Sequence, residues 1–458
     1  MLSTAPFRLL LAGIGLACVS AQARDGLPAY DYGVGGRTEI PLPTGVSVAV
    51  HAAAVDPQGR MLVVGRRGVR GFALRVNSDG VLDSSFGTDG WFVMPDLALL
   101  GFPAGTVTQF IAVSDSALGV YMAGYPVGAD RTCALVVALN ESGELRAGFG
   151  TSGSGALCGP SGLPPSISQP LSRFARLGLT VNPNRIAVLV VRTEHTTPNP
   201  AAEWVYGLTL TGAPLTSFGE QGLLTLPGDF RATGLTEDTQ GRLLISGYSG
   251  SGFAFMRLLP TNLVDPAFGT GGIATIPYPT FGVSPESMRA WVMLDDRPTV
   301  GFRNYTDFTY TLPNNYGFMR ATASGIADAS VAAIPAAANA GYVAHQTLGP
   351  EVVGRGDTDQ ASDRFDRVVV AGPELVRMLS DGQLDLAFGS NGYVDLPQPP
   401  SSETGPRFSQ AVAVDDAGNI HVVTSEQDAS SGTPVQGSLH VLKYGGDTLF
   451  DDGLEQLH

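Results

Sequence analysis

The stretch Asp79-Gly80-Val81-Leu82-Asp83-Ser84-Ser85-Phe86-Gly87, which continues through Gly90 to Pro95, decides the fold because its pattern recurs along the chain. The recurring part is a Phe-Gly-x-x-Gly phrase that ends at a proline. A mean spacing of about 59 residues separates the copies, a period typical of a repeat architecture. The copies, including the variants with Tyr, with Cys158 in place of the proline, or with an eroded phrase, begin at Tyr32, Phe86, Phe149, Phe218, Phe268, Val331 and Phe388.

The rest of each period predicts a small antiparallel sheet. A turn such as Asp56-Pro57-Gln58-Gly59 joins two apolar runs, a third run such as Phe72 to Val76 follows, and the recurring phrase leads into a fourth. Four short strands per period, joined as a meander, are typical of a β-propeller blade. One such blade cannot bury both of its faces, so neighbouring blades must stack on each other. The recurring Phe is therefore expected to be a core anchor between blades.

The four-stranded units predict an all-β fold. Because there are seven of them, the expected architecture is a β-propeller of seven four-stranded blades. The orphan segment Gly33–Pro43 is expected to complete the last blade, which would remove the exposed edge of an open array. Six or eight blades are the alternatives. The expected units of this single domain are 44–95, 96–160, 161–227, 228–277, 278–341, 342–397 and 398–458, with 30–43 completing the last one.

The repeats resemble the delta-60 repeat family. The matching text is the stretch from Asp79 to Gly87, and Asp381-Gly382-Gln383-Leu384-Asp385-Leu386-Ala387-Phe388-Gly389 is nearly as good. The resemblance covers almost all of the chain after residue 23, weakly in the fifth unit. It implies an exported bacterial protein with a propeller-like fold, and it brings no reaction and no catalytic residues.

The first 23 residues have the pattern of a secretory signal peptide. Arg8 supplies a basic start, Leu9–Val19 is an apolar stretch, and Ala21-Gln22-Ala23 is a cleavage site that makes Arg24 the first mature residue. The predicted location is therefore periplasmic, extracellular or on the cell surface, with a lipoprotein through Cys18 as the minor alternative.

Composition excludes several classes of protein. Gly (59) and Pro (32) together make up one residue in five and only 15% of residues are charged, which is unlike a coiled coil or a disordered chain. The net charge of −15 repels phosphate backbones, so no nucleic-acid partner is expected. No apolar run reaches the roughly 20 residues of a membrane-spanning helix. The sequence indicates no oligomeric state.

Cys133 and Cys158 are predicted to form a structural disulfide. They lie on the third and fourth strands of the second unit, and their indices place them opposite each other across a hairpin centred between residues 145 and 146. Export to an oxidising compartment favours the bond. Two separate thiols are the alternative.

No catalytic, metal or cofactor site is predicted. The six histidines are scattered without metal-ligand spacing, and His421 is expected to be a packed or half-exposed strand residue. Gly356-Asp357-Thr358-Asp359 lacks the third acid and the closing Glu of a calcium loop. Neither a nucleophile elbow nor a phosphate-binding glycine loop is present.

Long insertions fall in the connections between second and third strands and between units, and in a propeller both kinds emerge on one face. The richest is 303–316, where Tyr305, Asp307, Tyr310 and Tyr316 are candidate contacts for a carbohydrate or peptide, unless these rings only pack the loop onto its blade. The leading hypothesis is an exported, non-enzymatic propeller that binds a protein, peptide or glycan on this face. The alternatives are a secreted hydrolase or lyase with carboxylates at the channel mouth, and a purely structural envelope protein.

Overall fold

The protein is all-β in the computed structural model, and its described residues form 28 strands and one short 3-10 helix, η1 (Leu97–Leu100). The residues that the structure describes are 26–42, 46–100, 106–127, 133–158, 177–191, 203–249, 252–277, 286–292, 295–304, 315–331, 342–346, 359–363, 365–372, 374–397, 408–427 and 434–445. The strands are β1 (Arg37–Pro41), β2 (Val48–Val55), β3 (Met61–Arg67), β4 (Arg70–Val76), β5 (Trp91–Val93), β6 (Val107–Ser116), β7 (Gly119–Val127), β8 (Cys133–Leu139), β9 (Ser154–Cys158), β10 (Leu177–Asn182), β11 (Arg185–Val191), β12 (Glu203–Leu208), β13 (Leu223–Thr225), β14 (Phe230–Glu237), β15 (Leu243–Ser249), β16 (Gly252–Leu258), β17 (Ile273–Pro277), β18 (Glu286–Val292), β19 (Pro298–Asn304), β20 (Asn315–Arg320), β21 (Tyr342–Gln346), β22 (Asp359–Ser362), β23 (Val368–Ala371), β24 (Glu374–Met378), β25 (Tyr393–Asp395), β26 (Phe408–Val414), β27 (Ile420–Gln427) and β28 (Pro434–Tyr444).

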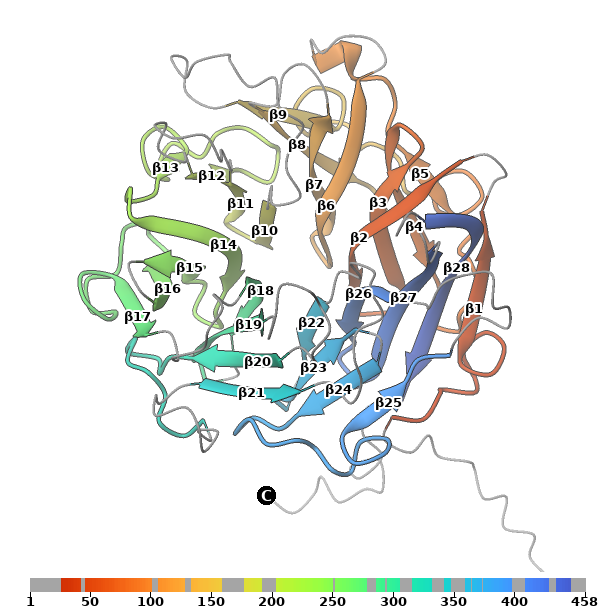
Figure 1. Cartoon of the computed structure of the whole chain (residues 1–458). Helices are drawn as coiled ribbons and strands as arrows, with labels where there is room; N and C mark the ends of the chain where they lie inside the picture. The colour runs from red at the N-terminus through yellow and green to blue at the C-terminus, as the bar shows by residue number, and fades with distance from the viewer. Residues whose placement is uncertain are drawn as a thin grey trace, which may run out of the picture.

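These strands form seven four-stranded antiparallel sheets arranged in a ring, which confirms the predicted β-propeller (Figure 1). Six sheets are meanders of consecutive strands, such as β2-β3-β4-β5 and β14-β15-β16-β17. The first strand of each sheet lies nearest the centre of the ring, and the fourth lies at its rim (Figure 1). We number the blades 1 to 7 in chain order, starting with β2–β5.

Blade 7 contains both ends of the described chain, with the order β1-β28-β27-β26. Strand β1 pairs antiparallel with β28 over all five of its residues, from Arg37 opposite Leu442 to Pro41 opposite Ser438. Outside these strands, the N–H of Ala29 donates to the carbonyl of Lys443 at 2.8 Å. The expected closure by the N-terminal segment is therefore present, and it covers the edge of β28.

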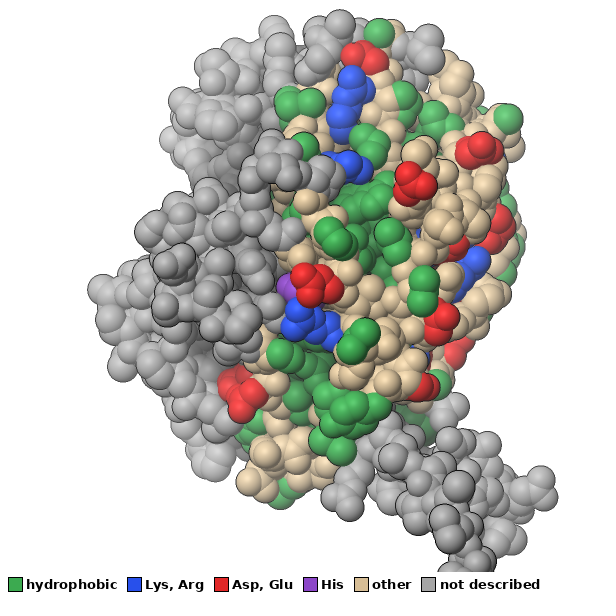
Figure 2. Space-filling view, turned by 90° about the vertical axis from the view of Figure 1, so that its right-hand side faces the viewer, with side chains coloured by type: hydrophobic (Ala, Val, Ile, Leu, Met, Phe, Trp, Pro, Cys, Tyr) green, Lys and Arg blue, Asp and Glu red, His purple; other side chains and the backbone are tan. Residues whose placement is uncertain are grey.

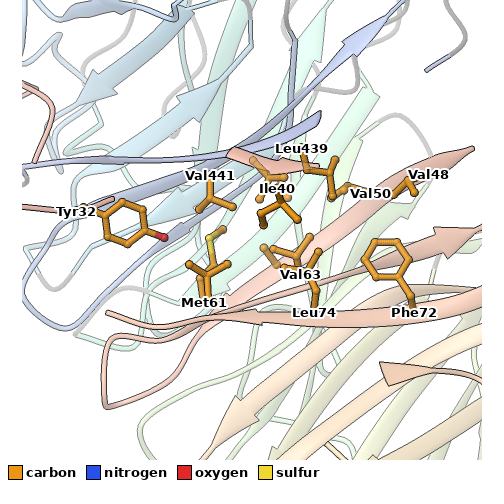
Figure 3. Close-up of a cluster of buried hydrophobic side chains, with 14 of the residues drawn as sticks. Tyr32, Ile40, Val48, Val50, Met61, Val63, Phe72, Leu74, Leu439 and Val441 are labelled. Atoms are coloured by element: carbon orange, nitrogen blue, oxygen red, sulfur yellow. The ribbon is translucent and has the colours of Figure 1, made fainter. Parts of the chain in front are cut away.

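Seven hydrophobic clusters hold the ring together, and each lies between two neighbouring blades. Figure 3 shows the cluster that joins blade 7 to blade 1, in which Ile40 and Val441 face Met61 and Val63. The recurring aromatic of the repeat belongs to these interfaces. Phe86, for example, is completely buried in the cluster that blade 1 shares with blade 2.

The recurring Phe-Gly also forms a backbone latch with the next blade. The N–H of Gly87 donates to the carbonyl of Ser142 in blade 2 at 2.7 Å, and Gly143 then sits directly on the ring of Phe86. A Cβ atom on Gly143 would lie 2.8 Å from that ring, and its φ of +73° already favours glycine. The turn glycine before the phrase is thus required by packing as well as by turn geometry.

A buried arginine–aspartate pair accompanies the latch in blade 1 and recurs in three other described blades. Arg75 donates through Nε to Asp83 at 2.7 Å, and its guanidinium carbon lies 4.5 Å from the centre of the Phe86 ring. The same arginine donates to the carbonyl of Glu141 in the next blade. The equivalent pairs are Arg257–Asp265, Arg320–Asp328 and Arg377–Asp385.

One expected unit boundary is wrong. The expected sixth unit begins at residue 342, whereas Tyr342–Gln346 is β21, the fourth strand of blade 5, and pairs with β20. In the other repeats the Phe-Gly phrase leads directly into the fourth strand, but here Val331 replaces the Phe and the strand begins later. Blade 6 consists of β22 to β25.

Because neighbouring strands are antiparallel, the ring has two distinct faces. The turns between first and second strands, such as residues 56–60, lie on one face, which we call the turn face. The connections between second and third strands, such as Gly68-Val69, and those between blades lie on the other, which we call the loop face.

Candidate functional site

The innermost strands enclose a central channel with a volume of about 490 Å³. Most of the described lining side chains are small or aliphatic, and His51 and Asp359 are the ionisable ones among them. The lining residues are His51, Ala52, Ala53, Ala54, Val55, Ile111, Ala112, Val113, Leu177, Gly178, Leu179, Thr233, Gly234, Leu235, Asp359, Ala361, Ser362, Ala413 and Val414. Such a wall offers a ligand a shaped surface and main-chain polar groups. It contains few side chains that could act as acids or bases.

The channel wall is shaped by β-bulges, which the sequence analysis did not foresee. The pairing of β2 with β3 shifts between Val50 and Ala52, so that His51 is the extra residue, and Ile111 in β6 and Thr233 in β14 hold the same position. Register shifts also occur in β18 and β26. A bulge redirects side chains, and all three named bulge residues line the channel.

Glycines in the second strands make these bulges possible. A Cβ atom on Gly65 would lie 2.0 Å from the carbonyl oxygen of Ala49, and one on Gly124 would lie 1.9 Å from that of Gln109. Gly247 approaches the first strand of its own blade just as closely. A glycine in the middle of an apolar strand often marks a bulge or a close backbone approach, and this was the available sequence signal.

Carboxylates directly follow three of the innermost strands on the turn face, where they cap turns. Asp56 accepts hydrogen bonds from the N–H groups of Gln58 and Arg60 at 2.9 Å each, and from Nε of Arg60 at 2.6 Å. Asp238 and Asp363 repeat this arrangement with the arginine four residues later. Their charges are thus neutralised locally, and these acids support the fold.

Two acids on blades 2 and 3, the half-buried Asp115 and the buried Glu203, behave differently. Burial raises the pKa of Asp115, at the end of β6, to about 6, and the negative charge of Asp56 adds to the rise. Burial raises the pKa of Glu203 to about 7, although its carboxylate accepts a hydrogen bond from the N–H of Ala232 in blade 4. Neither residue lines the described channel wall. Charges of blade 1 act on Asp115, and Glu203 bonds to blade 4, so both acids face a neighbouring blade.

His421 is a fully buried strand residue. This confirms the first of its two expected environments, a packed one. Its Nε2 lies 3.0 Å from Oδ2 of Asp415, and its ring meets the ring of Tyr32 edge to face at 5.9 Å between centres. Burial lowers the pKa of His421 below its usual value, against the opposing effect of Asp415. The pair lies inside blade 7 with no exposed histidine surface, which suits packing.

The proposed ligand contacts fall mainly outside the described residues. Tyr305, Asp307 and Tyr310 are among these undescribed positions. Tyr316 is on β20, where its backbone pairs with Arg303. The flanking strand ends, Asn304 and Asn315, lie opposite each other at the loop face. These four residues therefore stay a prediction.

The backbone places Cys133 directly opposite Cys158 in the pairing of β8 with β9. This register agrees with the index argument, and the disulfide itself stays a prediction. Within the described ranges no group of three or more potential metal ligands comes together. Those ranges also hold no helix of the length and apolarity that crossing a membrane requires.

Comparison with known proteins gives matches to solved structures at low similarity. No protein-family model and no curated protein matches the chain. A protein of unknown function from Dyadobacter fermentans matches over 89% of this chain and 98% of its own, with 11% identity and a TM-score of 0.39. A Lactobacillus plantarum protein matches over 75% and 86%, with 14% identity and a TM-score of 0.41. Prolyl oligopeptidase B from Galerina marginata matches over 89% of this chain but 52% of its own, so the chain spans about half of that enzyme, with 10% identity and a TM-score of 0.41.

Proposed function

We propose that this chain is an exported, non-enzymatic β-propeller of the delta-60 repeat type that binds a protein, peptide or glycan on its loop face. The observation that carries the proposal is that the acids at the turn-face ends of the innermost strands are bound within turns. A hydrolase or lyase at the channel mouth needs carboxylates that are free to exchange protons or attack a substrate. Asp56, Asp238 and Asp363 instead hold turns through two backbone N–H groups and an arginine each.

The two faces of the ring also differ in a way that supports binding. Turns on the turn face are short and closely repeated, as with residues 56–60 and 238–242. The connections at the loop face vary in length, from two residues in Gly68-Val69 to 18 between Cys158 and Leu177. Variable connections on a rigid scaffold are where binding residues concentrate.

The test is binding of the purified protein to cell-envelope material from the producing organism, measured by co-sedimentation. Replacing Tyr305 and Tyr310 together by serine is expected to reduce the bound fraction at least fivefold. Tyr30→Ser, at a position 69% exposed in the N-terminal segment, serves as the control and is expected to bind normally. Unchanged binding by the double variant would exclude this site.

Export has its own test. The protein recovered from the periplasm or medium is expected to begin at Arg24, as shown by N-terminal sequencing. An intact residue 1–23 segment on the recovered protein would contradict cleavage after Ala23.

A further inference from the structure

The hairpin between β3 and β4 concentrates positive charge in an otherwise acidic chain. Its tip reads Arg66-Arg67-Gly68-Val69-Arg70, three arginines and no acid in five residues, although acids outnumber lysine and arginine by 42 to 27 overall. This set of arginines, Arg66, Arg67 and Arg70, is called the basic hairpin below. On the side of the ring that Figure 2 shows, the Lys and Arg side chains (blue) are few and scattered.

The arrangement of these arginines is unfavourable without a counter-charge. Arg67 lies directly opposite Arg70 in the strand pairing, and like charges in that position repel each other. Arg70 is partly neutralised by Asp96, whose carboxylate lies 3.5 Å away. Within the described ranges, Arg66 and Arg67 have no carboxylate partner, which leaves a local excess of two positive charges.

Arg67 is also held in a geometry suited to recognition. Its guanidinium carbon lies 4.7 Å from the centre of the Trp91 ring, and Trp91 is itself packed on Phe72 at 5.2 Å between ring centres. Stacking occupies the flat face of a guanidinium and leaves the N–H donors in its plane, which match a carboxylate or phosphate in a bidentate manner. The stacked ring thus reduces the entropy that the side chain loses on binding.

The hairpin tip lies on the loop face, where the proposed function places the ligand. We propose that the basic hairpin binds an anionic group, carboxylate or phosphate, on a cell-envelope polysaccharide. This inference rests on the proposed function for the class of ligand and on the basic hairpin for its charge. The net charge of −15 disfavours long polyanions at a distance, but charges beyond a Debye length of about 8 Å are screened at physiological salt.

The experiment measures binding of the full mature chain to immobilised polygalacturonate, which supplies carboxylates, and to a phosphomannan, which supplies phosphates, with neutral dextran as the reference. Wild type is expected to bind at least one anionic polymer and not dextran. Arg66→Ser with Arg67→Ser is expected to weaken that binding at least tenfold. The control is Arg37→Ser with Arg231→Ser, which removes the same number of positive charges from a half-buried and an exposed position outside the hairpin and is expected to bind like wild type.

Arg67→Lys separates shape from charge, because lysine keeps the charge but lacks the planar, stacked fork. It is expected to lose part of the affinity while unfolding at the wild-type temperature. Equal weakening in the two double variants would mean a general charge effect and would overturn the proposal. So would binding of dextran, equal binding of duplex DNA, or no binding of either anionic polymer.

The outcomes also separate this inference from the proposed function. If Tyr305→Ser with Tyr310→Ser loses the envelope material while polygalacturonate or phosphomannan binding persists, both proposals stand as distinct contacts. If the tyrosine variant keeps full envelope binding but the basic-hairpin variant loses it, the tyrosine site is wrong and the basic hairpin is right. If only the basic-hairpin variant is indistinguishable from wild type, this inference alone fails.

Discussion

Replacing Asp115 by asparagine is expected to stabilise the propeller at alkaline pH. Asp115 lies at the end of β6, and its Oδ2 atom is buried without a hydrogen-bond partner among the described residues. Burial raises its pKa to about 6, the nearby Asp56 adds to the rise, and Arg60 and Arg75 oppose it. Glu141, in blade 2, is the other negative charge that faces it.

The magnitude follows from the difference between the folded and unfolded pKa values. The unfolded value is 3.8, and a difference of about two units corresponds to about 3 kcal/mol of stability. Because the folded pKa is the higher one, the protonated form favours folding. The cost of ionising Asp115 is therefore absent below about pH 4, grows as the pH rises, and is complete above about pH 6.

The assay is urea denaturation of wild type and Asp115→Asn at pH 4.5 and pH 8, monitored by tryptophan fluorescence. The variant is expected to gain up to about 3 kcal/mol over wild type at pH 8 and much less at pH 4.5. Glu203 also has a raised pKa and contributes a pH dependence common to both proteins, so only the difference between them is interpreted. A variant that is less stable than wild type at pH 8, or equally shifted at both pH values, would refute the reasoning.

Three further predictions concern the latch and the disulfide. Phe86→Ala is expected to lower the free energy of unfolding by about 3–5 kcal/mol, because the ring is completely buried between two blades, as urea denaturation would show. Gly143→Ala is expected to lower the melting temperature more than Gly241→Ala; both have φ near +72°, but only Gly143 has a neighbouring ring and backbone within 3 Å of the added Cβ, so equal losses would contradict the latch. Thiol titration of the denatured, unreduced mature protein is expected to find no free thiol at Cys133 or Cys158, and two free thiols would exclude the bond.

The blade pattern could be read from the sequence because each blade marks its contact with the next by the same few residues. Phe86 fills the interface and Gly143 leaves room for it, so both residue types recur at a fixed spacing. In blade 5, where Val331 replaces the aromatic, the repeat pattern wrongly predicts that the fourth strand belongs to the next unit. A repeat can thus be recognised in the sequence only where its interface residue is retained.

Two features were missed although the sequence carried a sign of each. The latch arginine and its aspartate, as in Arg75–Asp83 and Arg257–Asp265, recur at a separation of eight residues in four blades. The bulges are signalled by glycines such as Gly65 and Gly247. Glycine is a poor strand former, but at these positions the first strand passes so close that a Cβ atom would not fit. The channel could not be predicted from local pattern, because its wall combines strands from blades that are distant in sequence.

The meeting of β1 with β28 has a consequence for how the molecule must fold. The N–H of Gly26 donates to the carbonyl of Gly445, so a contact that completes the circle joins residues from opposite ends of the described chain. Such pairings have a very high contact order and form late, since the intervening chain must be ordered first. The same proximity makes the protein a suitable subject for circular permutation: Gly26 and Gly445 could be joined by a short linker and the chain reopened in a turn such as 238–242, which would convert the pairing of β1 with β28 into an ordinary local hairpin.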